Sequence, residues 1–303
     1  MSSHPALHLA IGAFDGVHLG HRAVLHSARD LARQTKGQVG VMTFDPHPSR
    51  VLRPQSAVPL IFNRTQKDER LTEAGVQFIH HHAFDAQHAA MEASEFPQWL
   101  QKTFLGLQSL HVGTNFQYGR NRSGNNQTLI QDAAAIGIKV QLVDPVILDN
   151  EPVSSSRIRA ALSSGAVSHA NQMLLRPYEA EGSIIPGKQI GRSIGFPTLN
   201  MDWSPELLPA FGVYAVELVT PNGVAEPGIA NWGLRPTVEA AALKPLLEIH
   251  LLRPTETLPS QGVTVRVRWL EYIRDEQKFA DLSALERQIT SDVQKAKIVL
   301  GLA

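Results

Sequence analysis

The sequence lacks several features that would assign it to particular protein classes. It contains no cysteine, which excludes disulfides, thiolate catalysis and cysteine-ligated zinc. Basic and acidic residues number 28 each, so the net charge is zero and nothing favours a nucleic-acid partner. No apolar run approaches the length of a membrane span, and the opening Met-Ser-Ser-His-Pro does not resemble a signal peptide. We therefore expect a cytoplasmic protein with no membrane or nucleic-acid partner. These features leave its oligomeric state open.

Length and pattern predict two domains, which we place at 1–170 and 171–303. In the first, strand-like and helical runs alternate, which predicts an α/β fold with a parallel sheet and ligands at the carboxyl ends of its strands. In the second, short β-like runs at 178–185, 212–219, 246–252 and 263–270 are typical of a small antiparallel barrel. A terminal amphipathic helix is expected over 282–300. Its apolar stripe would comprise Leu282, Leu285, Ile289, Val293, Ala296 and Val299.

The segment from Ile11 to His21 is the candidate centre of the first domain. An apolar run over 7–14, a helical pattern and a second apolar run over 39–44 predict one βαβ unit. Gly16 and Gly20 would let the backbone approach a ligand, and a helix start attracts anions. His18 and His21 lie three residues apart on the first turn and are candidates to donate ring N–H groups to one phosphate. Two alternatives stay open: solvated surface histidines, or a pair of metal ligands lacking a third.

Two later segments of the same domain also suit anionic ligands. In residues 111–124, the end of a strand leads into a glycine-containing loop with Asn115, aromatic residues and Arg122. Further on, Ser154, Ser155 and Ser156 precede a helix whose first turns contain arginines. Serine hydroxyls, free N–H groups and arginine at a helix start converge on anionic oxygens. The alternative is a helix cap with surface arginines.

Three other patterns receive ordinary structural interpretations. Residues 49–70 form a basic connection that we expect to be a solvated face. The run His80-His81-His82 ends a strand expected over 76–79, and adjacent side chains of a strand alternate faces, which argues against one metal site. Residues 88–107 show helical spacing through Met91, Phe96, Trp99, Leu100 and Phe104.

Phe14-Asp15-Gly16-Val17-His18-Leu19-Gly20-His21 resembles the HxGH signature of nucleotidyltransferases, and Val153 to Arg159 is similar to their ISSTxIR motif. The leading Phe-Asp-Gly-Val is similar to that of the bacterial bifunctional riboflavin kinase/FMN adenylyltransferases, or FAD synthetases. The resemblance implies a Rossmann-like domain in which the phosphate of FMN attacks the α-phosphorus of ATP and pyrophosphate leaves. It implies catalytic roles for His18 and His21. The ATP- and FMN-binding residues that it implies are Phe14, Asp15, Gly16, Gly20, Asn115, Arg122, Ser154, Ser155, Ser156 and Arg159.

The second domain resembles the riboflavin kinases of the same family. The similar segments are Gly191 to Asn200, Gly228 to Thr237, Leu247 to His250 and Tyr272 to Phe279. The resemblance implies ATP-dependent phosphorylation of riboflavin to FMN, with Glu248 as general base and Thr198 and Asn200 as ligands of Mg²⁺. The ATP- and riboflavin-binding residues that it implies are Gly191, Arg192, Gly195, Phe196, Pro197, Thr198, Asn200, Asn231, Arg235 and Arg274.

The chain departs from the family pattern at a few positions. Ser156 replaces a Thr, Tyr118 a Phe, Asn125 an Asp and Trp232 an Ile, while residues 252–259 lack an expected acidic and aromatic loop. The first hypothesis is a bifunctional enzyme that converts riboflavin to FMN and FMN to FAD. One alternative is an FMN adenylyltransferase with an impaired kinase module, and another is a flavin-binding sensor without turnover.

Overall fold

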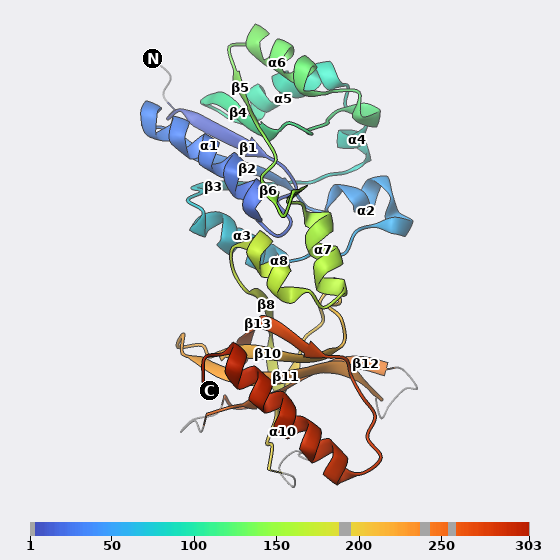
Figure 1. The fold of residues 1–303 in the computed structure, drawn as a ribbon. Coiled ribbons are helices and arrows are strands. Elements are labelled where there is room, and N and C mark those ends of the chain that lie inside the picture. The colour runs from blue at the N-terminus through green and yellow to red at the C-terminus, as the bar shows by residue number, and fades with distance from the viewer. Residues whose placement is uncertain (1–3, 188–194, 237–242, 254–258, 303) are drawn as a thin grey trace. The chain divides into compact units, whose positions relative to one another are not determined.

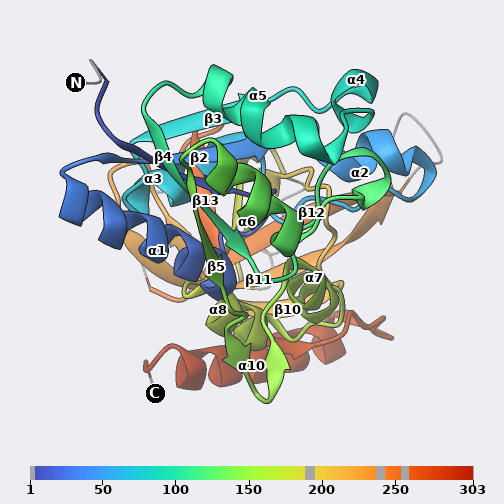
Figure 2. The same ribbon diagram turned by 90° about the horizontal axis from the view of Figure 1, so that it is seen from above.

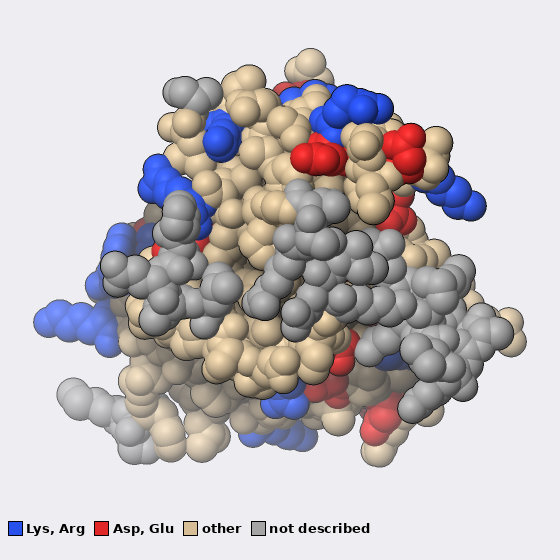
Figure 3. Space-filling model, turned by 90° about the horizontal axis from the view of Figure 1, so that it is seen from below, with Lys and Arg blue, Asp and Glu red and all other residues tan. Residues whose placement is uncertain are grey.

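The computed structural model describes residues 4–187, 195–236, 243–253 and 259–302. It divides into two compact units, Met1–Ser155 and Ser156–Ala303, which are taken separately below. No helix among these residues has the length and apolar character that crossing a membrane requires. Acidic and basic side chains are interspersed on the face shown in Figure 3, in keeping with the zero net charge.

Unit 1 is built on a parallel sheet with the strand order β3-β2-β1-β4-β5. The strands are β1 (Leu7–Ile11), β2 (Gln38–Phe44), β3 (Phe78–His82), β4 (Leu107–Gly113) and β5 (Lys139–Val143). The main helices are α1 (Leu19–Thr35), α3 (Arg64–Glu73), α5 (Phe96–Thr103) and α6 (Asn126–Ala135), with the short α2 (Pro48–Leu52) and η1 (Pro54–Ser56) between β2 and α3. The chain order reverses between β1 and β4, where open α/β sheets bind ligands. The predicted α/β fold is confirmed.

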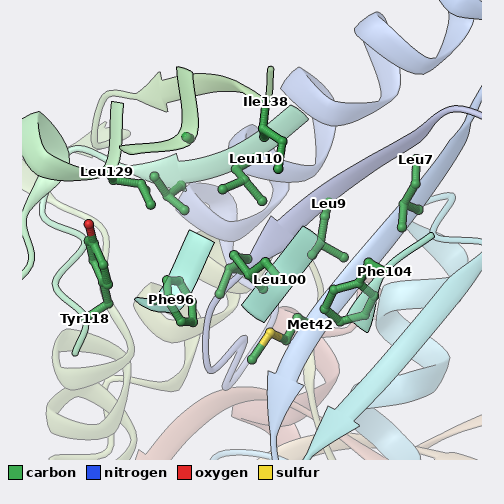
Figure 4. Close-up of a cluster of buried hydrophobic side chains, with 13 residues drawn as sticks. Leu7, Leu9, Met42, Phe96, Leu100, Phe104, Leu110, Tyr118, Leu129 and Ile138 are labelled. Carbon is green, nitrogen blue, oxygen red and sulfur yellow. The ribbon is translucent and has the colours of Figure 1, made fainter. Parts of the chain in front are cut away.

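Apolar side chains fill both faces of this sheet. Leu7, Leu9 and Ile11 of β1 belong to one buried cluster with side chains of α5 and α6 (Figure 4). Ala10 belongs to a second cluster, with residues of α1 and Leu71 of α3. The alternation along β1 follows the two-residue repeat of a strand. Helices therefore cover both faces (Figure 1), which leaves the strand ends for ligands.

Two local predictions in this unit were wrong in extent. The single helix expected over 88–107 is instead α4 (Ala86–Ala89), η2 (Ala93–Glu95) and α5. Glu92 and Glu95 form a capping box, and Pro97 lies in the first turn of α5, where proline starts a helix rather than continuing one. Strand β3 begins at Phe78 and includes the histidine run.

The histidines of β3 do alternate between faces. His81 Nε2 lies 2.8 Å from Asp68 Oδ1 on α3. The rings of His80 and His82 stack on each other with centroids 5.8 Å apart, and His82 contacts the ring of Trp99. Neighbouring side chains in this run therefore contact different elements, as strand geometry requires.

Unit 2 begins with helices α7 (Ser155–Ser163) and α8 (Val167–Leu174) and continues as an antiparallel barrel. The described barrel strands close in the order β10-β11-β12-β9-β8-β13. They are β8 (Tyr178–Ile185), β9 (Leu199–Asp202), β10 (Gly212–Val219), β11 (Ala225–Pro236), β12 (Leu243–Leu251) and β13 (Thr264–Arg274). The predicted barrel is confirmed, and β8 and β10 have the predicted bounds. Strands β9 and β11 were not predicted, because β9 has only four residues and β11 contains Pro227, Gly228 and Gly233, which resemble a turn.

Large aromatic residues fill the barrel, and a helix covers part of its outside. Trp203, Trp232 and Trp269 lie inside with ring centroids 4.9–6.4 Å apart. Trp232, one of the departures from the family pattern, is therefore a core residue. Helix α10 (Leu282–Val299) packs Val293 and Ala296 against outward-facing residues of β10 and β11 (Figure 2). The predicted stripe was wrong at its ends, because Leu282 and Val299 are 61% and 45% exposed.

Candidate active sites

The connection from β1 to α1 has an unusual backbone. Phe14, Gly16 and Val17 all have positive φ angles, of 49°, 86° and 41°, and this conformation is costly for a β-branched residue such as valine. The side chains of Phe14 and Val17 are buried in the cluster under α1, and Val17 N donates to Phe14 O over 3.2 Å. Packing thus holds a strained loop at the carboxyl end of β1, as is common at functional sites.

The two histidines of the HxGH segment form one stacked pair. His18 is the N-cap of α1, where its Nδ1 accepts a hydrogen bond from His21 N over 3.3 Å. The ring centroids lie 3.7 Å apart, with 16° between the planes. Since Nδ1 of His18 accepts, its proton is on Nε2. The structure therefore brings the two predicted imidazoles together at the start of the helix.

His21 is held in the neutral form by its surroundings. Burial, then the neighbouring His18 and Lys67, keeps the pKa of the His21 imidazole well below its usual value. His21 Nδ1 is shielded from water and has no hydrogen-bond partner among the described residues. Near neutral pH His21 therefore carries one N–H, and His18, whose Nδ1 accepts from His21 N, presents its Nε2–H. This pair can donate hydrogen bonds to phosphate oxygens without needing to be protonated.

Sequence reasoning missed Lys67. This residue of α3 donates from Nζ to Thr43 Oγ1 over 3.2 Å, and Thr43 Oγ1 donates to Ala13 O over 3.0 Å. Burial lowers the pKa of the Lys67 ammonium, and the nearby Asp15 opposes that shift most among the carboxylates. The solvated face expected over 49–70 was therefore wrong here. The available signal was the i, i+4 spacing of Lys67 and the apolar Leu71, which marks an inward helix face.

Asp15 and Ser155 make hydrogen bonds within the protein that stabilise the loop between β1 and α1. Asp15 is buried, and its carboxylate accepts from Ile61 N over 3.0 and 3.3 Å. Ser155 Oγ donates to Asp15 O over 2.9 Å. Gly20 lies against the His18 ring and Val153 O, where an added Cβ would come within 3.3 and 3.6 Å of them. Val153 and Ser155 thus contact the segment that contains the two histidines.

The loop after β4 is the second half of this site, because β4 pairs with β1. Asn115 and Arg122 are exposed there. Gly119 has a φ of 72°, and a Cβ on it would lie 2.7 Å from the Ala93 backbone. Asn125 Oδ1 accepts from Gln127 N over 2.9 Å and so caps α6. Asparagine and aspartate cap helices equally well, so this departure from the family pattern leaves the loop intact.

Ser156 and Arg159 belong to unit 2, on helix α7, and Ser154 belongs to unit 1. Gly165, one residue beyond the end of the helix and its cap, has a φ of 82°, as expected of a glycine that ends a helix. A Cβ added to Gly165 would lie 3.2 Å from the ring of Tyr272.

Strand register aligns the polar residues of the second candidate site. Glu248 on β12 pairs with Asn200 on β9 and with Asn231 on β11. The adjacent Leu247 and Ile249 are buried inside the barrel, so Glu248 and its two partners face outward. Three residues from three separate motifs therefore form one row on the outer surface of the barrel.

The surroundings of this row suit a cation and phosphates. Asn200 Oδ1 is buried with no hydrogen-bond partner among the described residues. Thr198, two residues earlier, is exposed. A threonine hydroxyl and an amide oxygen on one side of a strand are hard oxygen donors, which Mg²⁺ prefers. These residues therefore fit the predicted metal.

The loop before β9 is held by His250. His250 Nδ1 donates to Pro197 O over 2.8 Å, and its ring contacts the Phe196 ring edge-on at 5.4 Å. Gly195 has a φ of 83°. The predicted Gly191 and Arg192 lie outside the described residues, as do the side chain of Arg235 and positions 254–258 of the divergent segment.

Arg274 has a buried carboxylate partner that the sequence did not indicate. Its Nε and Nη2 each lie 2.8 Å from Asp292 Oδ2 on α10. Asp292 is buried and also accepts from Gln288 Nε2 over 2.8 Å. Further along, Asn231 Nδ2 donates to Glu276 Oε1 over 3.3 Å. The segment after β13 therefore connects the polar row with the terminal helix.

Comparisons with known proteins match two different families to the two parts of the chain. The family model described as FAD synthetase matches residues 1–157, and the one described as riboflavin kinase matches residues 174–300. A bifunctional riboflavin kinase/FMN adenylyltransferase of Escherichia coli is 34% identical over 97% of this chain and 93% of its own length. One from Bacillus subtilis is 33% identical over 95% and 90%. A solved structure titled as a macrolide-efflux protein from Streptococcus pneumoniae has a TM-score of 0.86 at 26% identity, covering 98% of this chain and 95% of that one.

Proposed function

This chain belongs to the family of bifunctional riboflavin kinase/FMN adenylyltransferases, and we propose how its own residues carry out the two reactions. The kinase module phosphorylates riboflavin to FMN with ATP, and the adenylyltransferase module converts FMN and ATP to FAD and pyrophosphate. The observation that carries the residue assignment is the pair of polar clusters, one at the carboxyl ends of β1 and β4 and one on the outer surface of the barrel. The compartment we propose is the cytoplasm, where both reactions find ATP.

In the adenylyltransferase, His18 and His21 donate N–H groups to triphosphate oxygens at the start of α1. A phosphate oxygen of FMN attacks the α-phosphorus, and the bond to the bridging oxygen of pyrophosphate breaks. The protein supplies no nucleophile, so its contribution is position and charge stabilisation. Lys67, beside Asp15 and His21, offsets the negative charge that accumulates as pyrophosphate leaves. Asn115 and Arg122, from the loop after β4 of the same unit, place the phosphates.

In the kinase, Glu248 accepts the proton of the riboflavin 5′-hydroxyl as that oxygen attacks the γ-phosphorus of ATP. Asn200 and Asn231 flank Glu248 in the row and fix the positions of its ligands. Thr198 and Asn200 would hold Mg²⁺, which neutralises charge on the ATP phosphates when bound. Arg274 acts from the end of strand β13, which pairs with β10 and β8, and is oriented by Asp292.

The decisive experiment follows riboflavin, FMN and FAD over time by chromatography. His21→Ala should lower FAD formation from FMN by about 10²-fold, as removal of one preorganised donor does, and leave FMN formation intact. Glu248→Gln should show the reverse pattern, so each variant is the folding control of the other. Equal loss of both activities in either variant contradicts the assignment. Chelation of Mg²⁺ should stop FMN formation, and unchanged turnover would refute the metal role of Thr198 and Asn200.

A further inference from the structure

Helix α1 carries a second polar stripe that neither reaction uses. Residues of α1 and of the end of α3 (Figure 1) surround a cavity of about 360 Å³, at the small end of the roughly 300–1,000 Å³ typical of ligand pockets. From α1 come Leu19, Arg22, Ala23, His26 and Arg29, and the remaining wall is formed by Glu73, Ala74 and Val146. The α1 residues recur at i, i+3, i+4 and i+7, so they share one helix face.

The acidic and basic residues of this cavity have different partners. Glu73, the acidic residue of the lining, has its Oε1 2.7 Å from Arg70 Nη1. Arg29 makes no ion pair among the described residues; its Nη2 donates to His26 Nδ1 over 3.4 Å. His26 Nε2 in turn lies 3.2 Å from Asp30 Oδ2. Since His26 Nδ1 accepts, its proton is on Nε2 and is donated to Asp30. This relay orients the Arg29 guanidinium without neutralising it.

We propose that this cavity binds the phosphate group of a small molecule. A guanidinium presents paired N–H donors that match two phosphate oxygens, and Arg22 adds a second guanidinium from the same helix face. The apolar side chains of Leu19, Ala23, Ala74 and Val146 form one part of the wall, against which a short organic group packs. The site is separate from the stacked histidines of the adenylyltransferase and does not depend on the proposed function.

The test compares two variants that each remove one positive charge from α1. Arg29→Gln alters the cavity, whereas Arg33→Gln alters an arginine that is absent from the lining and exposed to solvent. Binding of inorganic phosphate and of glycerol phosphate to the full chain is measured by calorimetry. Arg29→Gln should weaken binding at this site by about tenfold, the worth of one charge-assisted hydrogen bond, and Arg33→Gln by less than about twofold. Equal affinities in wild type and Arg29→Gln overturn the proposal.

A second measurement places the site and needs no substitution. Crystals of the wild-type chain are soaked with selenate, a phosphate analogue with an anomalous signal. A peak bounded by Arg22, His26 and Arg29 supports the proposal, and its absence there refutes it even if Arg29→Gln fails to fold. Tighter binding of glycerol phosphate than of inorganic phosphate identifies a phosphate ester as the ligand, and equal binding identifies the inorganic ion.

Discussion

A buried hydrogen-bonded chain in unit 1 predicts how stability depends on pH. Thr35 Oγ1 donates to Leu31 O, so it accepts from His8 Nε2 over 2.7 Å. His8 Nδ1 then accepts from Ser109 Oγ over 2.6 Å, and Ser109 Oγ accepts from His111 Nε2 over 2.8 Å. The chain ends where Ser27 Oγ donates to His111 Nδ1 over 2.9 Å. In this chain of hydrogen bonds each imidazole donates from one ring nitrogen and accepts at the other. A ring that accepts at one nitrogen carries a single proton, so both histidines are neutral in this arrangement.

The magnitude follows from the pKa of His111. Burial, and then the neighbouring His8, lowers the pKa of His111 from 6.5 to about 4. An unfolded chain binds more protons than the folded one between these values, so the stabilisation is fully present above pH 6.5 and is lost as the pH falls towards 4. Linkage gives a loss of about 2 kcal/mol in the free energy of unfolding between about pH 8 and pH 5. Burial also lowers the pKa of His8, which adds to the loss.

The assay compares wild type with His111→Gln, whose amide keeps a donor and an acceptor but does not titrate. Amide hydrogen exchange in peptides from β1 and β4, read by mass spectrometry, reports the opening free energy of unit 1 at each pH. The variant should lose about 2 kcal/mol less than wild type between pH 8 and pH 5. His80, His82 and His88, whose pKa values are also lowered, contribute equally to both proteins. An unchanged pH dependence in His111→Gln would refute the reasoning, and the exposed His26→Gln serves as control.

The remaining predictions concern the two reactions. Lys67→Met should lower FAD formation from FMN by about 10²-fold with FMN formation unchanged; a change in neither reaction contradicts a catalytic role for this ammonium. Gly187→Ala should raise the Mg²⁺ requirement of the kinase, because a Cβ there would collide with Asn200 Nδ2 and displace that side chain; titration with Mg²⁺ checks it. Asp292→Asn should raise the riboflavin KM several-fold, because the orientation of Arg274 is lost, and an unchanged KM would make this contact purely structural.

Much of the fold could be predicted from local patterns. The βαβ unit around His18, the strands over 178–185 and 212–219 and the terminal helix each have a hydrophobic period that a short window contains. The histidine pair could be predicted as well, because three residues of helix separate its members. The helix over 88–107 failed because a capping box and Pro97 outweigh an apolar period.

Other features depend on residues that meet only when the chain is folded. Lys67 reaches the histidines from a helix that follows another strand, and the ion pair of Arg274 with Asp292 joins β13 to α10. Nothing local to either segment indicates its partner.

The βαβ unit of the first module, the change to a barrel in the second and the chemical types of the residues in each motif follow from the sequence alone, because each depends on spacing along one segment. The tertiary structure decided which of these residues share a surface. Asn200, Glu248 and Asn231 align only because β9, β12 and β11 pair in one register, and a shift of one residue would turn Glu248 into the barrel. Register is set by packing across the whole barrel, which no short window of sequence contains.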